Sequence, residues 1–165
     1  MPQEFSYEEA IRLAIETEKE LMDFYRRAAD LTADPEGKRV FETLADDERE
    51  HALHFFNLYS GGALGTFQQF IDEPGTTQSA MMHDLEKRFS RDTKARGAME
   101  IALREERDLE KTLRLTASRI VDPMVRNVFE RMAVETRRHY DVIESEYARL
   151  MGMVHETDID TYVRE

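Results

Sequence analysis

Apolar residues recur every three or four positions through most of the chain, and this spacing predicts amphipathic α-helices rather than strands. The pattern predicts four long helices, over about 6–32, 35–60, 80–120 and 122–151. Ser6 and Glu9 form a capping-box pattern at the start of the first helix. Asp-Pro pairs at 34–35 and 122–123 are typical starts for the second and fourth helices.

The segment between the second and third helices lacks a clear period. Gly61, Gly62, Gly65 and Pro74 interrupt the pattern over 61–79, so we expect a long crossover that is helical only in part. Gly97, inside the third predicted helix, is a place where that helix could divide. Residues 152–165 form an acidic C-terminal tail, which we expect to be loose or to add a short helix.

The two halves of the chain repeat each other. A shift of 88 residues, without a gap, aligns identical residues of the first half with those of the second. The identical positions in the first half include Ala10, Ala14, Glu18, Leu21, Arg26, Ala29, Asp34, Pro35, Val40, Phe41, Glu42, Ala45, Arg49 and His51. This repeat predicts an all-α, ferritin-like antiparallel four-helix bundle in a domain over 1–151. Its helical hairpins, over about 6–60 and 80–151, share a pseudo-twofold axis and are joined by the crossover at 61–79.

Several titratable residues lie on the inward faces of these helices. Glu18 lies 16 residues before Asp34, and His51 lies 16 residues after Pro35, so the two reach the same height in an antiparallel pair. Glu48 shares a face with His51 three residues later. The second hairpin repeats this register. The pattern therefore predicts one layer that contains Glu18, Glu48, His51, Glu106 and His139.

Three buried carboxylates cost several kcal/mol per charge unless they are compensated, and a pair of divalent cations would compensate them. Carboxylates and Glu-x-x-His motifs on facing helices are the known arrangement of di-iron bundles. The other charged residues around Glu48 are predicted to face solvent: Asp46, Asp47, Arg49 and Glu50. His54 has no counterpart in the second hairpin and is predicted to be peripheral.

The runs AIRLAIETEKELMDFYRRAA and DPEGKRVFETLADDEREH resemble the ferritin-like domain of the rubrerythrin family. The resemblance covers most of residues 6–151. It implies a site for two iron ions that reacts with oxygen or peroxide. It also implies, by motif, the metal ligands Glu18, Glu48, His51, Glu106 and His139. Tyr25, seven residues after Glu18, matches a tyrosine that could bond a ligand carboxylate or scavenge a radical, and core packing is the alternative.

Three features depart from the family pattern. Thr136 stands where the second Glu-x-x-His motif requires Glu; neighbouring Glu135 either replaces it as a sixth ligand or points sideways. Leu109 stands where the family has a second glutamate in the third helix, which weakens the expectation of peroxidase chemistry. The family usually carries a Cys-ligated rubredoxin domain that delivers electrons, but this sequence contains no Cys, so we expect no rubredoxin domain and a separate partner as the electron donor.

Composition narrows the functional classes. The net charge of −12 argues against nucleic acid and anionic membrane surfaces as partners. No signal peptide or apolar span is visible, which predicts a cytoplasmic protein. Together with the Glu/His layer, the resemblance implies an oxidoreductase of the ferroxidase or peroxidase type with two iron ions, and a homodimer is a possible assembly. The alternatives are zinc, manganese, a single metal or an empty site in a structural or partner-binding bundle, and iron storage in a cage.

Overall fold

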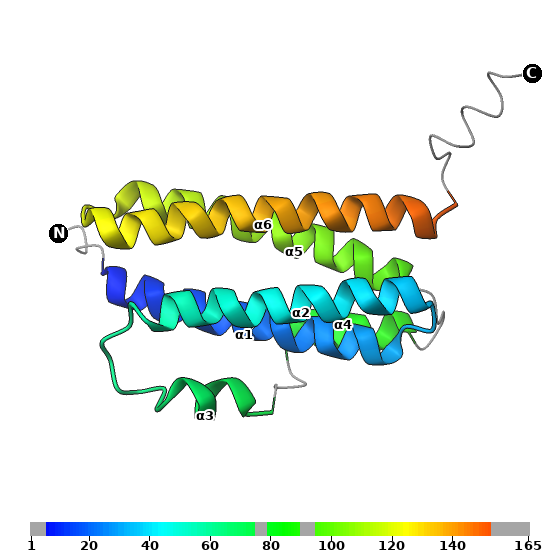
Figure 1. The fold of residues 1–165 in the computed structure, drawn as a ribbon, viewed down its shortest axis with the longest axis horizontal. Helices are drawn as coiled ribbons and strands as arrows, with labels where there is room; N and C mark the ends of the chain where they lie inside the picture. Colours follow the sequence, from blue (N-terminus) through cyan, green and yellow to red (C-terminus); the bar gives the residue numbers. More distant parts are fainter. Residues whose placement is uncertain (1–5, 75–78, 90–94, 153–165) are drawn as a thin grey trace, which may run out of the picture.

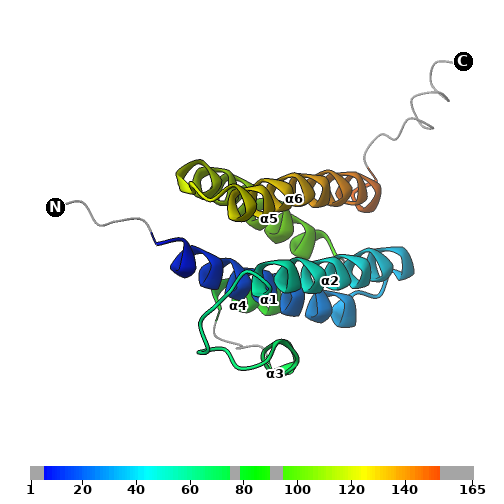
Figure 2. The same ribbon diagram turned by 60° about the vertical axis from the view of Figure 1, so that its left-hand side comes forward.

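The computed structural model describes residues 6–74, 79–89 and 95–152, and every regular element in these ranges is an α-helix. The helices are α1 (Tyr7–Leu31), α2 (Pro35–Phe56), α3 (Phe67–Asp72), α4 (Ala80–Phe89), α5 (Arg96–Arg119) and α6 (Pro123–Leu150). Helices α1 and α2 form one packed hairpin, and α5 and α6 form a second (Figure 1). The two hairpins lie over each other as two layers (Figure 2). The predicted all-α architecture of two paired hairpins is confirmed.

The helix ends follow the capping signals in the sequence. The Ser6 hydroxyl accepts a hydrogen bond from the Glu9 amide at 3.5 Å at the start of α1. Asp34 accepts from the Gly37 amide at 2.8 Å and places Pro35 in the first turn of α2. Asp122 caps α6 in the same way. These caps fix where each hairpin turns, and so they fix the relative height of residues on the paired helices.

An apolar core joins the hairpins. The largest buried side chains include Phe24, Phe41, Phe55 and Phe129, all at most 1% exposed. The rings of Phe55 on α2 and Phe129 on α6 meet edge to face, with centroids 4.9 Å apart. This contact joins α2 to α6 and encloses the space between the hairpins.

The third long helix differs from its prediction. It begins at Arg96 rather than at about 80, because residues 80–89 form the separate helix α4, which packs on α5 and α1. Gly97 lies in the first turn of α5, where the Arg88 side chain of α4 approaches it closely. A Cβ atom added at Gly97 would lie 2.8 Å from the nearest Arg88 atom, so glycine permits the two helices to pack together.

The crossover contains α3, which lies outside the two layers on the α1–α2 side (Figure 1). Lys19 of α1 holds the end of this segment: its Nζ donates to the Glu73 carbonyl at 2.7 Å and to Asp23 at 2.8 Å. The Lys19 side chain is largely buried, and its Nζ lies 5.9 Å from the centroid of the Phe70 ring of α3. The predicted C-terminal tail lies outside the described residues from 153 onward.

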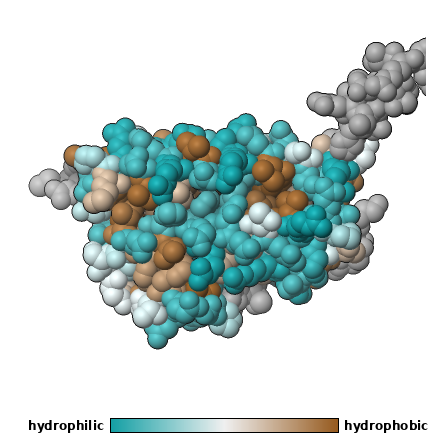
Figure 3. Space-filling model, in the orientation of Figure 1, coloured by the Kyte–Doolittle hydropathy of each residue, from teal (hydrophilic) through white to brown (hydrophobic). Residues whose placement is uncertain are grey.

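The surface is mostly hydrophilic, with small separate apolar patches on the face seen in Figure 3. Within the described residues, no helix has the length and apolar character needed to cross a membrane.

Candidate metal centre

Five of the predicted site residues meet in one buried layer between the hairpins. We call it the Glu/His layer; it consists of Glu18 from α1, Glu48 and His51 from α2, Glu106 from α5 and His139 from α6. Each of these side chains is at most 5% exposed. Every one of the four long helices therefore supplies a titratable side chain to the same layer.

Glu48 lies at the centre of the layer. Its Oε1 is 2.8 Å from Nδ1 of His139, and its Oε2 is 3.6 Å from Nδ1 of His51. The two imidazole rings stack with centroids 5.0 Å apart. One ligand atom from each of Glu48, His51 and His139 lies within 4.8 Å of the other two. This group can hold a metal ion.

The remaining two carboxylates lie on opposite sides of the imidazole pair. Glu18 Oε2 is 3.6 Å from Nδ1 of His51, and Glu106 Oε1 is 3.6 Å from Nδ1 of His139. Each hairpin thus contributes one Glu and one His in equivalent positions, as the sequence repeat requires. Glu48 lies three residues before His51 on the same face of α2, and it contacts both His51 and His139.

Tyr25 is attached to this layer through Glu106. The Tyr25 hydroxyl is fully buried and donates a hydrogen bond to Glu106 Oε1 at 2.5 Å. Its ring stacks on Phe41 with centroids 6.1 Å apart. Burial and the nearby Glu106 carboxylate raise the pKa of Tyr25 well above its usual value, so the hydroxyl remains a donor.

In the metal-free protein, protons bound to the side chains of the Glu/His layer reduce its negative charge. Burial and the proximity of Glu48 raise the pKa of Glu18, and the same two causes raise the pKa of Glu106 to about 7. Burial opposes charge on the imidazoles, but the neighbouring glutamates outweigh it and raise the pKa of His51 to about 10. They raise the pKa of His139 to about 11. The carboxylates therefore hold protons on both histidines at neutral pH.

The residues present fit a metal ion. Among the described residues, five buried side-chain atoms have no hydrogen-bond partner, and all five belong to the Glu/His layer. They are Glu18 Oε1, Glu18 Oε2, Glu48 Oε2, His51 Nδ1 and Glu106 Oε2. Unpartnered buried polar atoms are costly, and a coordinated cation supplies a partner for several oxygens and nitrogens at once. Carboxylate oxygen and imidazole nitrogen are ligands suited to iron, manganese and zinc.

Thr136 is buried beside the layer but adds no carboxylate to it. Thr136 is 1% exposed, and its hydroxyl donates to the Met132 carbonyl one turn earlier at 2.7 Å. Glu135 lies outside the layer, where Arg138 binds it at 2.5 Å. Of the six residues predicted as ligands, the structure therefore brings five together and leaves Glu135 in a pocket at the protein surface.

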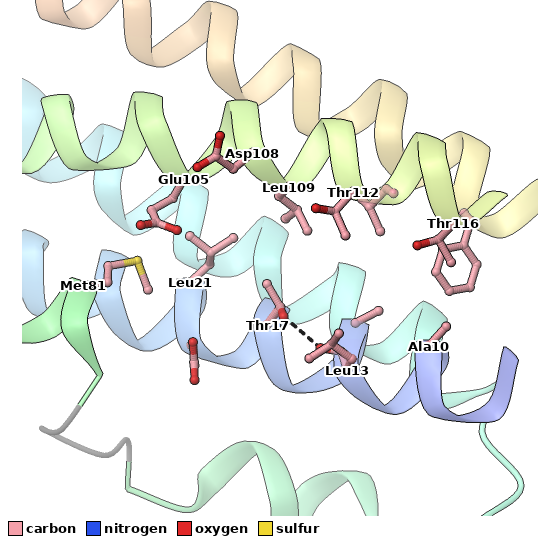
Figure 4. Close-up of a pocket in the computed structure, with 14 residues that line it drawn as sticks. Ala10, Leu13, Thr17, Leu21, Met81, Glu105, Asp108, Leu109, Thr112 and Thr116 are labelled. Carbon is pink, nitrogen blue, oxygen red and sulfur yellow. Dashed lines mark hydrogen bonds between the residues drawn. The ribbon is translucent and has the colours of Figure 1, made fainter. Parts of the chain in front are cut away.

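A groove of about 310 Å³ lies between α1 and α5, beside the Glu/His layer (Figure 4). Leu21 and Leu109 form part of its wall, each one turn after a glutamate of the layer. Thr17 also lines it and donates its hydroxyl to the Leu13 carbonyl at 2.8 Å. Leu109 thus gives this side of the layer an apolar wall.

Asp47 is the functional candidate that sequence reasoning missed. It was predicted to face solvent, yet its Oδ2 lies 3.1 Å from Nε2 of His139, although its side chain is 38% exposed. The signal was present in the repeat, because the shift of 88 residues aligns Asp47 with another acid, Glu135.

Comparison with known proteins supports one part of this description. No curated protein and no solved structure matches the chain. The rubrerythrin family model matches residues 3–59, which contain α1, α2 and three members of the Glu/His layer, Glu18, Glu48 and His51. The match does not extend to a rubredoxin domain. Over residues 3–59 the chain is therefore similar to the rubrerythrin family, and the structure adds a buried Glu/His cluster that can hold a metal.

Proposed function

We propose that the Glu/His layer binds two iron ions and that the protein oxidises Fe(II) with oxygen or peroxide. The observation that carries this proposal is the set of unpartnered carboxylate and imidazole atoms buried between four helices. When all three buried carboxylates are ionised, they carry three negative charges. One divalent ion would leave one negative charge and two would leave one positive charge, which a small anion from solvent could balance.

The residues divide into two ligand sets that share Glu48. Glu18 and His51 would bind one ion, and Glu106 and His139 would bind the other, since each pair lies on its own side of the layer. Glu48 could serve either set, because it contacts both histidines. Two Fe(II) ions, when bound, would supply one electron each, enough to reduce oxygen to hydrogen peroxide or peroxide to water with protons from solvent. Carboxylates suit both oxidation states because they are hard ligands.

Tyr25 and the surrounding apolar residues support the site. The Tyr25 hydroxyl orients Glu106 by donating to one of its oxygens, which leaves the other oxygen, Oε2, without a partner and free to bind metal. The 165 residues contain no Cys, so a thiolate-ligated electron carrier would come from outside them. We propose a separate protein as the reductant.

Anaerobic titration with Fe(II), followed by addition of oxygen, tests this proposal. We expect saturation near two ions per chain and an oxo-bridged Fe(III) absorption after oxygen is added. Saturation well below two ions, or no absorption change, would refute the di-iron function. The variant Glu48→Ala removes the ligand common to both halves and is expected to abolish binding. His54→Gln, which changes an exposed histidine outside the layer, is the matched control.

A second function is favoured by Thr136. Because Thr136 replaces the carboxylate that would mirror Glu48, the layer could bind a single ion, zinc for instance, or serve a structural bundle without metal. Elemental analysis of protein purified without added metal distinguishes these cases from the di-iron site. In a metal-free structural bundle at neutral pH, Glu48→Ala should lower thermal stability, because Glu48 is the carboxylate that pairs with both buried, protonated histidines.

A further inference from the structure

His139 is held at both ring nitrogens, which distinguishes it from the other histidine of the layer. Nδ1 lies 2.8 Å from Glu48 Oε1 inside the layer, and Nε2 lies 3.1 Å from Asp47 Oδ2 at its edge. A carboxylate only accepts hydrogen bonds, so the hydrogen of this outer bond belongs to Nε2 of His139. The inner bond to Glu48 likewise needs a hydrogen on Nδ1, so the metal-free ring donates from both nitrogens. A metal ion that binds at Nδ1 would replace that hydrogen and leave the Nε2 hydrogen on Asp47.

His51 lacks such an outer partner. Its Nδ1 faces Glu18 and Glu48 at 3.6 Å each, and in the described part of the chain no hydrogen bond is found at its Nε2. The ring is only slightly more exposed than that of His139. The two imidazoles therefore occupy equivalent places in the repeat but are oriented by different numbers of contacts.

The sequence repeat explains this difference. The shift of 88 residues that aligns His51 with His139 also aligns Asp47 with Glu135, and aligns Glu48 with Thr136. Glu135 is thus the counterpart of the outer carboxylate, not of the ligand. It lines the same surface pocket as His51 and Asp47, but Arg138 binds it at 2.5 Å.

We propose that Asp47 is a positioning residue that fixes His139 for metal binding through Nδ1, and that Glu135 is its repeat counterpart rather than a metal ligand. This inference rests on the proposed metal site. Because Arg138 binds Glu135, Glu135 does not orient an imidazole of the layer. Only the ring of His139 is therefore held by an outer carboxylate before metal binds. Outer carboxylates that bind a ligand histidine raise metal affinity because they fix the ring and its tautomer.

The test is Zn(II) affinity, measured by competition with a chromophoric chelator, because Zn(II) binding requires no redox reaction. We expect Asp47→Asn and Asp47→Ala to weaken Zn(II) binding by about 10–100-fold, as loss of an outer partner typically does. Glu135→Gln removes a carboxylate from the same pocket and is expected to change affinity by less than about twofold. This comparison separates orientation of His139 from a general effect of negative charge.

A spectroscopic measurement adds a result that a merely structural role would not produce. In Zn(II)-loaded protein labelled with 15N-histidine, long-range 1H–15N spectra should show His139 bound through Nδ1 with hydrogen on Nε2. Asp47→Ala should weaken or shift the Nε2–H signal of His139 and leave that of His51 unchanged.

The outcomes are distinguishable. Unchanged affinity in both Asp47 variants, or an equal loss in Glu135→Gln, would overturn the assignment of Asp47 while leaving the metal site intact. If the unmodified protein does not bind Zn(II) or Fe(II), the proposed metal site fails and this inference fails with it.

Discussion

Metal binding to the Glu/His layer should release protons, and the number can be worked out from the structure. The pKa values of His51 and His139 are raised to about 10 and about 11, so near pH 7.5 both rings are protonated in the metal-free protein. A metal ion binds only the neutral imidazole, so each ligating ring must lose one proton. We therefore expect about two protons per chain from the histidines, and more if Glu18 or Glu106 also carries a proton. By linkage, apparent affinity should rise by about 100-fold per pH unit for two released protons.

Calorimetric titration with Co(II) in two buffers of different ionisation enthalpy measures this number directly. His139→Gln should reduce proton release by about one if the variant still binds, whereas His54→Gln, outside the layer, should leave it unchanged. Release of fewer than one proton per chain near pH 7.5, together with an affinity that does not depend on pH, would refute the reasoning. In that case the layer would not hold its histidines as cations before metal binds.

Three further predictions concern the protein around the metal. Thr136→Glu adds the carboxylate that mirrors Glu48; we expect it to raise metal stoichiometry if the site holds fewer than two ions, and to lower the melting temperature of the metal-free protein. Tyr25→Phe removes the hydrogen bond to Glu106 and should lower the free energy of unfolding by about 2 kcal/mol in urea titrations of metal-free protein; an unchanged value would contradict this. Lys19→Met should reduce hydrogen-exchange protection in α3 without changing metal affinity, because Lys19 holds only the crossover.

The raised pKa values of the two histidines predict that the stability of the metal-free protein falls as pH rises. A histidine whose pKa is raised on folding stabilises the folded state below its unfolded pKa, and this stabilisation is lost as pH rises through the folded value. For His51 and His139 the loss should extend from about pH 6.5 to about pH 10–11. Urea midpoints of metal-free protein should therefore fall across this range; a rise would contradict the charge arrangement.

Much of the fold was predictable because its signals are local. Asp34 and Asp122 each precede a proline and cap the following helix, so the hairpin turns could be located by reading the sequence alone. The separation of α4 from α5 was predictable only in part. Gly97 indicated where the third predicted helix could divide, but the close approach of Arg88 to Gly97 is a tertiary contact that helical periodicity does not encode.

The residues that form the Glu/His layer could also be predicted, because their distances from the hairpin turns can be counted in the sequence. Antiparallel pairing converts equal distances from a turn into equal heights, which placed Glu18 beside His51 and Glu106 beside His139. The position of Glu135 could not be decided this way, because one residue rotates a helix by about 100° and the result depends on Arg138. Arg138 lies three residues later on the same helix, so this pair is local, but spacing alone does not say whether Glu135 binds Arg138 or turns toward the layer.

The groove between α1 and α5 makes the two long sides of the bundle mechanically unequal. On the opposite side, α2 and α6 pack directly and are joined by the contact of Phe55 with Phe129. Separation of the hairpins along α2 and α6 would break that packing, whereas along α1 and α5 the two helices are linked through α4, which packs on both of them. The direct link and the link through α4 therefore lie on opposite sides of the bundle. A small molecule that enters the groove would meet the acidic side chains of Glu20, Glu105 and Asp108 as well as Leu21 and Leu109, so the lining favours cations over anions on this route toward the layer.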